Sequence, residues 1–179
     1  MPGDRFLPDA VFASAPAGTR VRLTGIIVLT LFPFLIVLNV AVAPARDPVG
    51  RWMVALAPLI GLVIMAGTWI GARVRCYRLA GDELLVERVL QTVRFPLDGL
   101  QDVTPDRDAF RSAWKIYGND GLGAVAGRFR SKRLGTFRAY VTDREHAVVL
   151  RWPDHCLVVS PQQHTLFIEA VRRRAGLSR

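Results

Sequence analysis

A glycine-rich segment at residues 121–126 has the spacing of a nucleotide-binding loop. Its residues, G-L-G-A-V-A, fit the pattern G-x-G-x-x-A, and the acidic residue Asp143 follows about 20 positions later, as a dinucleotide site requires. In such a site the glycines let the backbone approach a pyrophosphate at the start of a helix. Here the following residues, G-R-F-R-S-K-R, are poor helix formers, and strand patterns follow one another without intervening helices. The sequence therefore favours a flexible loop with tight turns over a nucleotide site.

Residues suited to acid–base or nucleophilic chemistry are dispersed along the chain. His155 and Cys156 are neighbours, so on one strand their side chains would point to opposite faces. A cysteine nucleophile needs its histidine on the same side. Asp143, Glu145 and His146 cluster where a turn is expected, and polar residues are common in turns. We therefore expect no catalytic site, although a pocket lined by histidine and carboxylates would revive an enzyme as a third hypothesis.

The two cysteines, Cys76 and Cys156, have neither the C-x-x-C spacing of a redox pair nor neighbouring metal ligands. A disulfide between them would require an oxidising compartment. We expect buried free thiols, no metal site and no cofactor.

A basic stretch is the best candidate for a contact with lipid or a partner. It contains Arg128, Arg130, Lys132 and Arg133, with the aromatic Phe129 among them, in a chain of net charge +9. Basic side chains near an anionic membrane surface are worth about 1 kcal/mol each. The alternative is a solvated strand face with Phe129 pointing into the core. Nucleic acid is disfavoured, because no recognition helix or stacking motif accompanies the charge.

Two uncharged apolar runs near the start of the chain must anchor whatever follows them. They occupy residues 23–45 and 52–72, and each is long enough to cross a hydrocarbon core of about 30 Å as a helix. They predict a transmembrane helical hairpin within residues 21–72. Arginines flank the first run on its N-terminal side and the second on its C-terminal side, which favours a multi-pass protein of the inner (plasma) membrane with both termini cytoplasmic. Residues 1–20, with three prolines, are expected to be a disordered cytoplasmic lead.

Small residues follow one face of the second run. Gly67 and Gly71 form G-x-x-x-G, and Ala57 and Gly61 continue the face. Small residues allow two helices to approach closely. We expect the other helix of the hairpin to pack there, with a homodimer as the second choice.

The tail, residues 73–179, alternates short apolar and polar stretches broken by turn residues, which predicts about seven strands. Gly81-Asp82 is expected to join the first two strands in a hairpin. A helix at about residues 161–175 follows, with Ser160 as its N-cap, an apolar stripe through Phe167 and Val171, and Gly176 at its end. Residues 105–134 are not assigned.

The order of these pieces resembles the bacterial pleckstrin-homology (PH)-like domain proteins over roughly residues 73–175. The carrying pieces are C-Y-R-L-A-G-D-E-L-L-V, G-x-x-G-L-G-x-x-x-G-R-F, L-G-T-F-R-A-Y-V-T, and V-V-S-P before the helix. The resemblance implies an α+β membrane protein with a seven-stranded antiparallel β-barrel or sandwich that a C-terminal helix caps. It also implies a membrane-associated module that binds partners.

One departure limits what the resemblance implies. Lipid-binding members of the wider superfamily gather basic residues in the loop between the first two strands, whereas here that loop is Gly81-Asp82-Glu83. Phosphoinositide binding is therefore not carried over. We predict a non-enzymatic docking or assembly module held at the lipid bilayer, with a protein partner or a second copy of the chain. A sensor of anionic lipid that uses residues 128–133 is the alternative.

Overall fold

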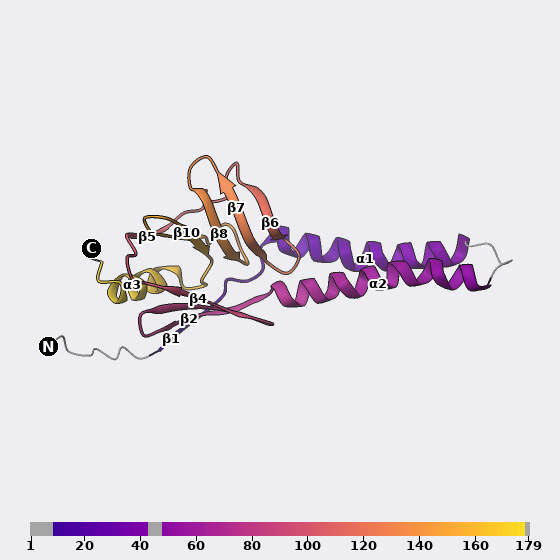
Figure 1. Cartoon of the computed structure of the whole chain (residues 1–179), viewed down its shortest axis with the longest axis horizontal. Helices are drawn as coiled ribbons and strands as arrows, with labels where there is room; N and C mark the ends of the chain where they lie inside the picture. Colours follow the sequence, from indigo (N-terminus) through magenta and orange to yellow (C-terminus); the bar gives the residue numbers. More distant parts are fainter. Residues whose placement is uncertain (1–8, 43–47, 178–179) are drawn as a thin grey trace.

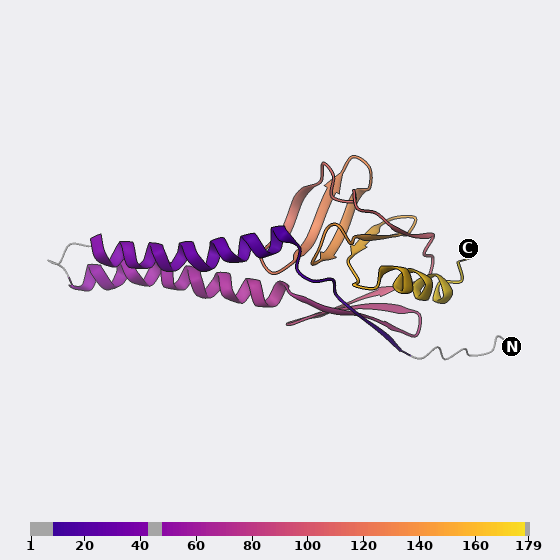
Figure 2. The ribbon, with the colours of Figure 1, turned by 180° about the vertical axis from the view of Figure 1, so that it is seen from behind.

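The computed structural model describes the backbone of residues 9–42 and 48–177. Figures 1 and 2 show a long pair of helices that projects from one side of a β-domain, with a short helix on the opposite side of that domain.

Two antiparallel helices, α1 (Thr19–Val42) and α2 (Pro48–Ala72), lie side by side along their length (Figure 1). Many of their apolar side chains are exposed, including Phe34 at 61% and Val63 at 65%. Within the described residues, Thr19–Leu38 is long and apolar enough to cross a membrane, and Pro58–Ala72 is a shorter apolar helix. These helices therefore present to their surroundings a surface that water does not favour.

The β-domain is a sandwich of two open sheets. The first sheet has the order β1-β2-β3-β4 and contains β1 (Ala10–Ala13), β2 (Val74–Ala80), β3 (Glu83–Arg88) and β4 (Thr92–Pro96). The second has the order β5-β9-β10-β8-β7-β6 and contains β5 (Asp102–Pro105), β6 (Trp114–Asp120), β7 (Val125–Ser131), β8 (Gly135–Val141), β9 (Val148–Arg151) and β10 (Cys156–Val159).

The predicted sandwich with a C-terminal helix is confirmed, but the barrel, the count of seven strands and the purely antiparallel pairing are wrong. Neither sheet closes on itself, and the described residues form ten strands. Strands β6 and β7 come from the unassigned residues, and β1 comes from the N-terminal lead. Strand β10 pairs parallel with β8, Cys156 opposite Phe137, and antiparallel with β9. The predicted hairpin at Gly81 is confirmed, because β2 and β3 pair antiparallel up to Ala80 and Glu83.

The expectation of a disordered lead is wrong for residues 9–18, while residues 1–8 lie outside the described part. Strand β1 pairs antiparallel with β2, from Ala10 opposite Leu79 to Ala13 opposite Cys76. The lead contains three prolines, but the exposed edge of β2 offers residues 10–13 a row of backbone partners, and Phe12 meets Phe167 edge to face at 5.3 Å. The helix pair is thus inserted between two neighbouring strands of one sheet.

Helix α3 (His164–Arg174) covers the core between the sheets, with Phe167 and Val171 fully buried. It begins later than predicted, and Ser160 is not its N-cap, because Ser160 is buried and bonded within the sheet region. The predicted end is confirmed: Gly176 has φ +68°, and the Leu177 N–H donates to the Arg172 carbonyl at 2.9 Å.

Candidate functional site

A buried polar network joins the β-domain to the segment that leads into α1. The Tyr77 hydroxyl donates to the Tyr140 carbonyl at 2.7 Å and accepts the Ser160 N–H at 3.1 Å. The Ser160 hydroxyl in turn accepts the Thr142 N–H at 2.9 Å. The Thr142 hydroxyl donates to the Ala15 carbonyl at 2.6 Å. This bond holds the lead just before α1 begins at Thr19.

Burial makes this network sensitive to the loss of any member. Tyr77 is fully buried, and this burial raises the pKa of its hydroxyl to about 12. Backbone bonds from Ala15 N–H to the Ser160 carbonyl (2.8 Å) and from Gly18 N–H to the Thr142 carbonyl (3.0 Å) continue the attachment. The orientation of α1 relative to the sandwich is therefore fixed by bonds on both sides of residue 15. Sequence reasoning missed this role, because Ser160 followed by Pro161 has the pattern of a helix start.

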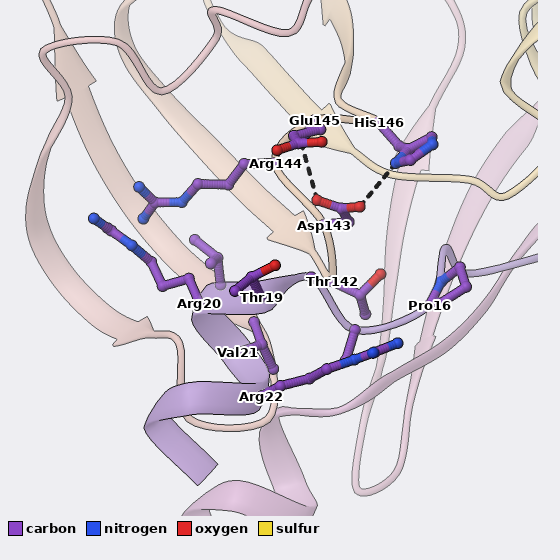
Figure 3. A pocket seen from close by; sticks show the side chains of 13 residues that line it. Pro16, Thr19, Arg20, Val21, Arg22, Thr142, Asp143, Arg144, Glu145 and His146 are labelled. Carbon is purple, nitrogen blue, oxygen red and sulfur yellow. Dashed lines mark hydrogen bonds and ion pairs between the residues drawn. The ribbon is translucent and has the colours of Figure 1, made fainter. Parts of the chain in front are cut away.

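A pocket of about 500 Å³ lies beside this network, between the start of α1 and the loop after β8 (Figure 3). Asp143 accepts the Glu145 N–H at 3.1 Å and lies 2.8 Å from His146 Nδ1. These bonds fold the loop back on itself, and the neighbouring Thr142 hydroxyl is already bonded to Ala15. The predicted turn at these residues is confirmed. The Asp143 carboxylate and the His146 imidazole thus stabilise the turn.

Arginines from two elements meet one carboxylate at the rim of this pocket. Asp120, at the end of β6, pairs with Arg144 from the loop and lies 3.9 Å from Arg20 of α1. Burial lowers the pKa of the Arg144 guanidinium, which also lies 4.6 Å over the Phe110 ring. The pairing ties α1 to the second sheet, and the polar network ties the lead to Thr142 and Ser160, which follow β8 and β10 of the same sheet. We name this set of contacts the helix–domain junction.

The described side chains offer no cluster that could bind a metal ion. Within residues 9–42 and 48–177, no group of three or more His, Cys, Asp or Glu side chains is placed to hold a metal ion.

The residues of the predicted basic stretch, 128–133, lie in different environments. Phe129 is 1% exposed and packs in the core against Phe110 and Phe137. Arg133 pairs with Asp106, in the turn beyond β7. Arg128 and Arg130 share the outer face of β7, where their neighbours on β8 are Arg138 and Thr136 respectively. The structure therefore brings together Arg128, Arg130 and Arg138, rather than residues 128–133.

An exposed aromatic strand lies beside these arginines. Strand β6 is an edge strand, and Trp114, Ile116 and Tyr117 are 51%, 49% and 55% exposed. Trp114 faces Arg130 and Tyr117 faces Arg128 across the β6–β7 pair. We name this basic and aromatic surface of β6, β7 and β8 the β6 face. Sequence reasoning left residues 105–134 unassigned, although W-K-I-Y was a signal that could have placed a strand there.

The small-residue face of α2 does not pack against α1 along its whole length. A side chain at Gly61 would meet Phe32 of α1 at 3.2 Å, but one at Gly67 would meet nothing within 4 Å. One at Gly71 would meet Leu90 of the β3–β4 turn at 2.7 Å. The expected partner is therefore correct at Gly61 and wrong at Gly71, where α2 leaves its companion helix and meets the β-domain. The side chain of Ala57 lies outside the described residues.

The glycine-rich segment forms the tight turn between β6 and β7, as predicted. Gly121 and Gly123 have φ of +116° and +79°, and Asn119 accepts the Leu122 N–H at 3.0 Å. Gly123 lies against the Trp69 backbone of α2, so a side chain there would collide with the helix. This turn is a second attachment of the sandwich to the helices.

Both cysteines are free, and both are half-buried rather than buried as expected. Burial, followed by a hydrogen bond to Glu87 at 3.2 Å and its charge, raises the pKa of Cys76 to about 11. Burial also raises the pKa of Cys156. Neither thiol is therefore a ready nucleophile near neutral pH.

The fold agrees with a family comparison. The chain matches the model described as Bacterial PH domain over residues 75–175. The match covers more than half of its 179 residues, so the chain belongs to the bacterial PH domain family. Comparison with curated proteins and with solved structures found no match. A PH-like domain indicates a module that binds protein or lipid, whereas strand β1 and both long helices lie outside the matched range.

Proposed function

We propose that this chain is a non-enzymatic docking module that α1 and α2 anchor together in the inner membrane, with both chain ends cytoplasmic. The single observation that carries the proposal is the rigid attachment of a PH-like sandwich to an apolar helix, Thr19–Leu38, whose side chains are largely exposed. Exposed Ile64 at 65% and Ile60 at 50% extend the apolar surface onto α2. Arginines at both domain-side ends of the helices, including Arg22 and Arg73, support the orientation.

The partner that we propose is a protein with an acidic surface, bound at the β6 face. Unpaired backbone groups on an edge strand offer hydrogen bonds to an added strand. Trp114 and Tyr117 supply aromatic contact area, and tryptophan, tyrosine and arginine dominate binding energy at protein interfaces. Arg128, Arg130 and Arg138 supply charge complementarity to carboxylates. A second copy of the chain fits this surface less well, since its arginine and lysine exceed its acidic residues by nine and two copies would repel each other.

The test is crosslinking in native membranes, with a photoreactive residue at position 116. Carbonate-washed membranes should retain the chain, and the crosslink should give a defined heterologous adduct. Arg128→Glu with Arg130→Glu should reduce adduct yield at least fivefold through charge repulsion. Arg173→Glu, on exposed Arg173 of α3, should leave it unchanged. Release of the chain by carbonate, or an adduct equally abundant in both charge variants, would contradict the proposal.

The second candidate function is sensing of anionic lipid through the same arginines. The observation that favours it is that Arg128 and Arg138 lie directly opposite each other on β7 and β8, which concentrates positive charge on that face. Binding of the chain in neutral nanodiscs to added vesicles containing phosphatidylglycerol should then fall with Arg128→Gln and Arg130→Gln. Vesicle binding that is unchanged by both substitutions would remove this candidate.

A further inference from the structure

A groove of about 770 Å³ lies where the domain-side end of α2 meets both sheets. On one side stands the β3–β4 turn with Leu90 and Gln91, and on the other stand β6, β7 and the turn between them (Figure 1). The helix contributes Met65, Gly67, Thr68, Gly71 and Ala72. This volume is typical of a small-molecule site.

The absence of side chains at two glycines creates the groove. A Cβ atom built at Gly67 would have no other atom within 4 Å. The G-x-x-x-G motif therefore leaves a furrow on α2 at this position. At Gly71 the helix lies directly against Leu90, and this contact ends the furrow. Leu90 itself is 76% exposed. The furrow continues onto the exposed apolar surface of α2 at Ile64. A ligand with an apolar chain can therefore extend from the groove along the helix.

The groove has one permanent charge at its domain end. Among the described residues that line it, Arg88 is the only arginine or lysine, and none is a carboxylate. The Arg88 Nη2 donates to the Gly71 carbonyl at 3.1 Å, and its guanidinium lies 5.7 Å over the Tyr140 ring. Its Nε is buried and has no hydrogen-bond partner within the described residues. A guanidinium that lines a groove without a carboxylate attracts a ligand that supplies an anionic oxygen.

We infer that this groove binds one anionic glycerophospholipid, with its phosphate at Arg88 and an acyl chain along Gly67. Gln91, Asn119 and Tyr140 line the groove together with the apolar residues Met65, Leu90 and Leu122. The inference rests on the proposed membrane anchoring, because a bilayer supplies the lipid and apolar surface continuous with the groove. The site adjoins the β6 face and shares Tyr117 with it, but its arginine is Arg88 rather than Arg128, Arg130 or Arg138.

A bound lipid would also bridge three parts of the molecule. It would contact α2, the first sheet through Arg88 and the second sheet through Tyr117 and Tyr140. Occupancy should therefore stabilise the folded chain in proportion to the bound fraction.

The test is native mass spectrometry of the whole chain in mild detergent with added phosphatidylglycerol or phosphatidylcholine. The unsubstituted chain should retain one phosphatidylglycerol in preference to phosphatidylcholine. Arg88→Gln should lower retention of phosphatidylglycerol about fivefold, the effect of one arginine at an anionic surface. The matched Arg94→Gln, on exposed Arg94 of β4, should retain lipid as the unsubstituted chain does.

A second variant tests the groove without touching the charge. Gly67→Leu should fill the furrow with a side chain and abolish retention of both lipids. The fold should tolerate this substitution, because a Cβ atom at position 67 meets no other atom within 4 Å. The control is Ile70→Leu, on the α2 surface outside the groove. Equal lipid retention in Arg88→Gln, Gly67→Leu and the controls would overturn the site and leave Arg88 as a helix cap. Failure of the proposed membrane anchoring is distinguishable from failure of the lipid site, because without anchoring carbonate would release the chain from the membranes.

Discussion

Removing one buried hydroxyl from the helix–domain junction should measurably destabilise the chain. Tyr77→Phe deletes the group that donates to the Tyr140 carbonyl at 2.7 Å and accepts the Ser160 N–H at 3.1 Å. Each buried group left without a partner costs about 1–3 kcal/mol. The Ser160 hydroxyl, 3.4 Å away, offers partial compensation, so we expect a net loss of about 2 kcal/mol.

Thermal unfolding of the chain in detergent should register this loss. For a chain of this length, 1 kcal/mol corresponds to a shift of about 2–4 °C, so Tyr77→Phe should lower Tm by about 4–8 °C. Tyr117→Phe is the matched control, because it deletes the same hydroxyl from a tyrosine that is 55% exposed. That variant should remain within about 0.5 kcal/mol of the unsubstituted chain.

The pH dependence gives the same variant an independent test. The Tyr77 pKa is about 12 in the folded chain and about 10 in the unfolded chain, so between these values only the unfolded state releases the proton. The stability contributed by the protonated phenol is complete below pH 10 and falls as pH rises. The gap between the unsubstituted chain and Tyr77→Phe should therefore shrink by about 1 kcal/mol from pH 8 to pH 11. A gap that is absent at pH 8, or that does not change with pH, would refute the reasoning.

Three further predictions concern the core, the thiol and the attachment of the helices. Phe129→Ala should destabilise the chain by about 3–5 kcal/mol in the same thermal assay, because Phe129 is a core residue, whereas Arg130→Ala should cost less than about 1 kcal/mol. Maleimide should label Cys76 slowly at pH 8, and Glu87→Gln should accelerate labelling, because it removes a carboxylate that raises the Cys76 pKa; unchanged labelling kinetics would contradict this cause. Gly123→Ala should force the β6–β7 turn away from α2 and increase proteolysis at that turn, and a protease pattern like that of the unsubstituted chain would count against the contact.

Several elements followed from local patterns because their causes are local. The β2–β3 hairpin needed only alternating residues and a glycine turn, and the end of α3 needed only Gly176 after an apolar stripe. The glycine turn between β6 and β7 is of the same kind, although its docking on Trp69 is not.

The lead and Ser160 show what local patterns cannot decide. Residues 10–13, A-V-F-A, are too short an apolar run to indicate a strand by themselves, and they form one because β2 has a free edge beside them. Ser160 has the pattern of a helix cap, but the chain 83 residues earlier brings the Tyr77 hydroxyl to it. A partner distant in sequence is invisible to a pattern that spans four residues.

By itself, the sequence determined that the chain has long apolar helices, an excess of arginine and a β-rich tail, because hydropathy, charge and alternation are properties of neighbouring residues. The tertiary structure alone decided which arginines share a face, where the small-residue face of α2 opens into a groove, and how the lead locks the helices to the sandwich. These features depend on strand register and on contacts between distant segments, which only the packed chain brings together.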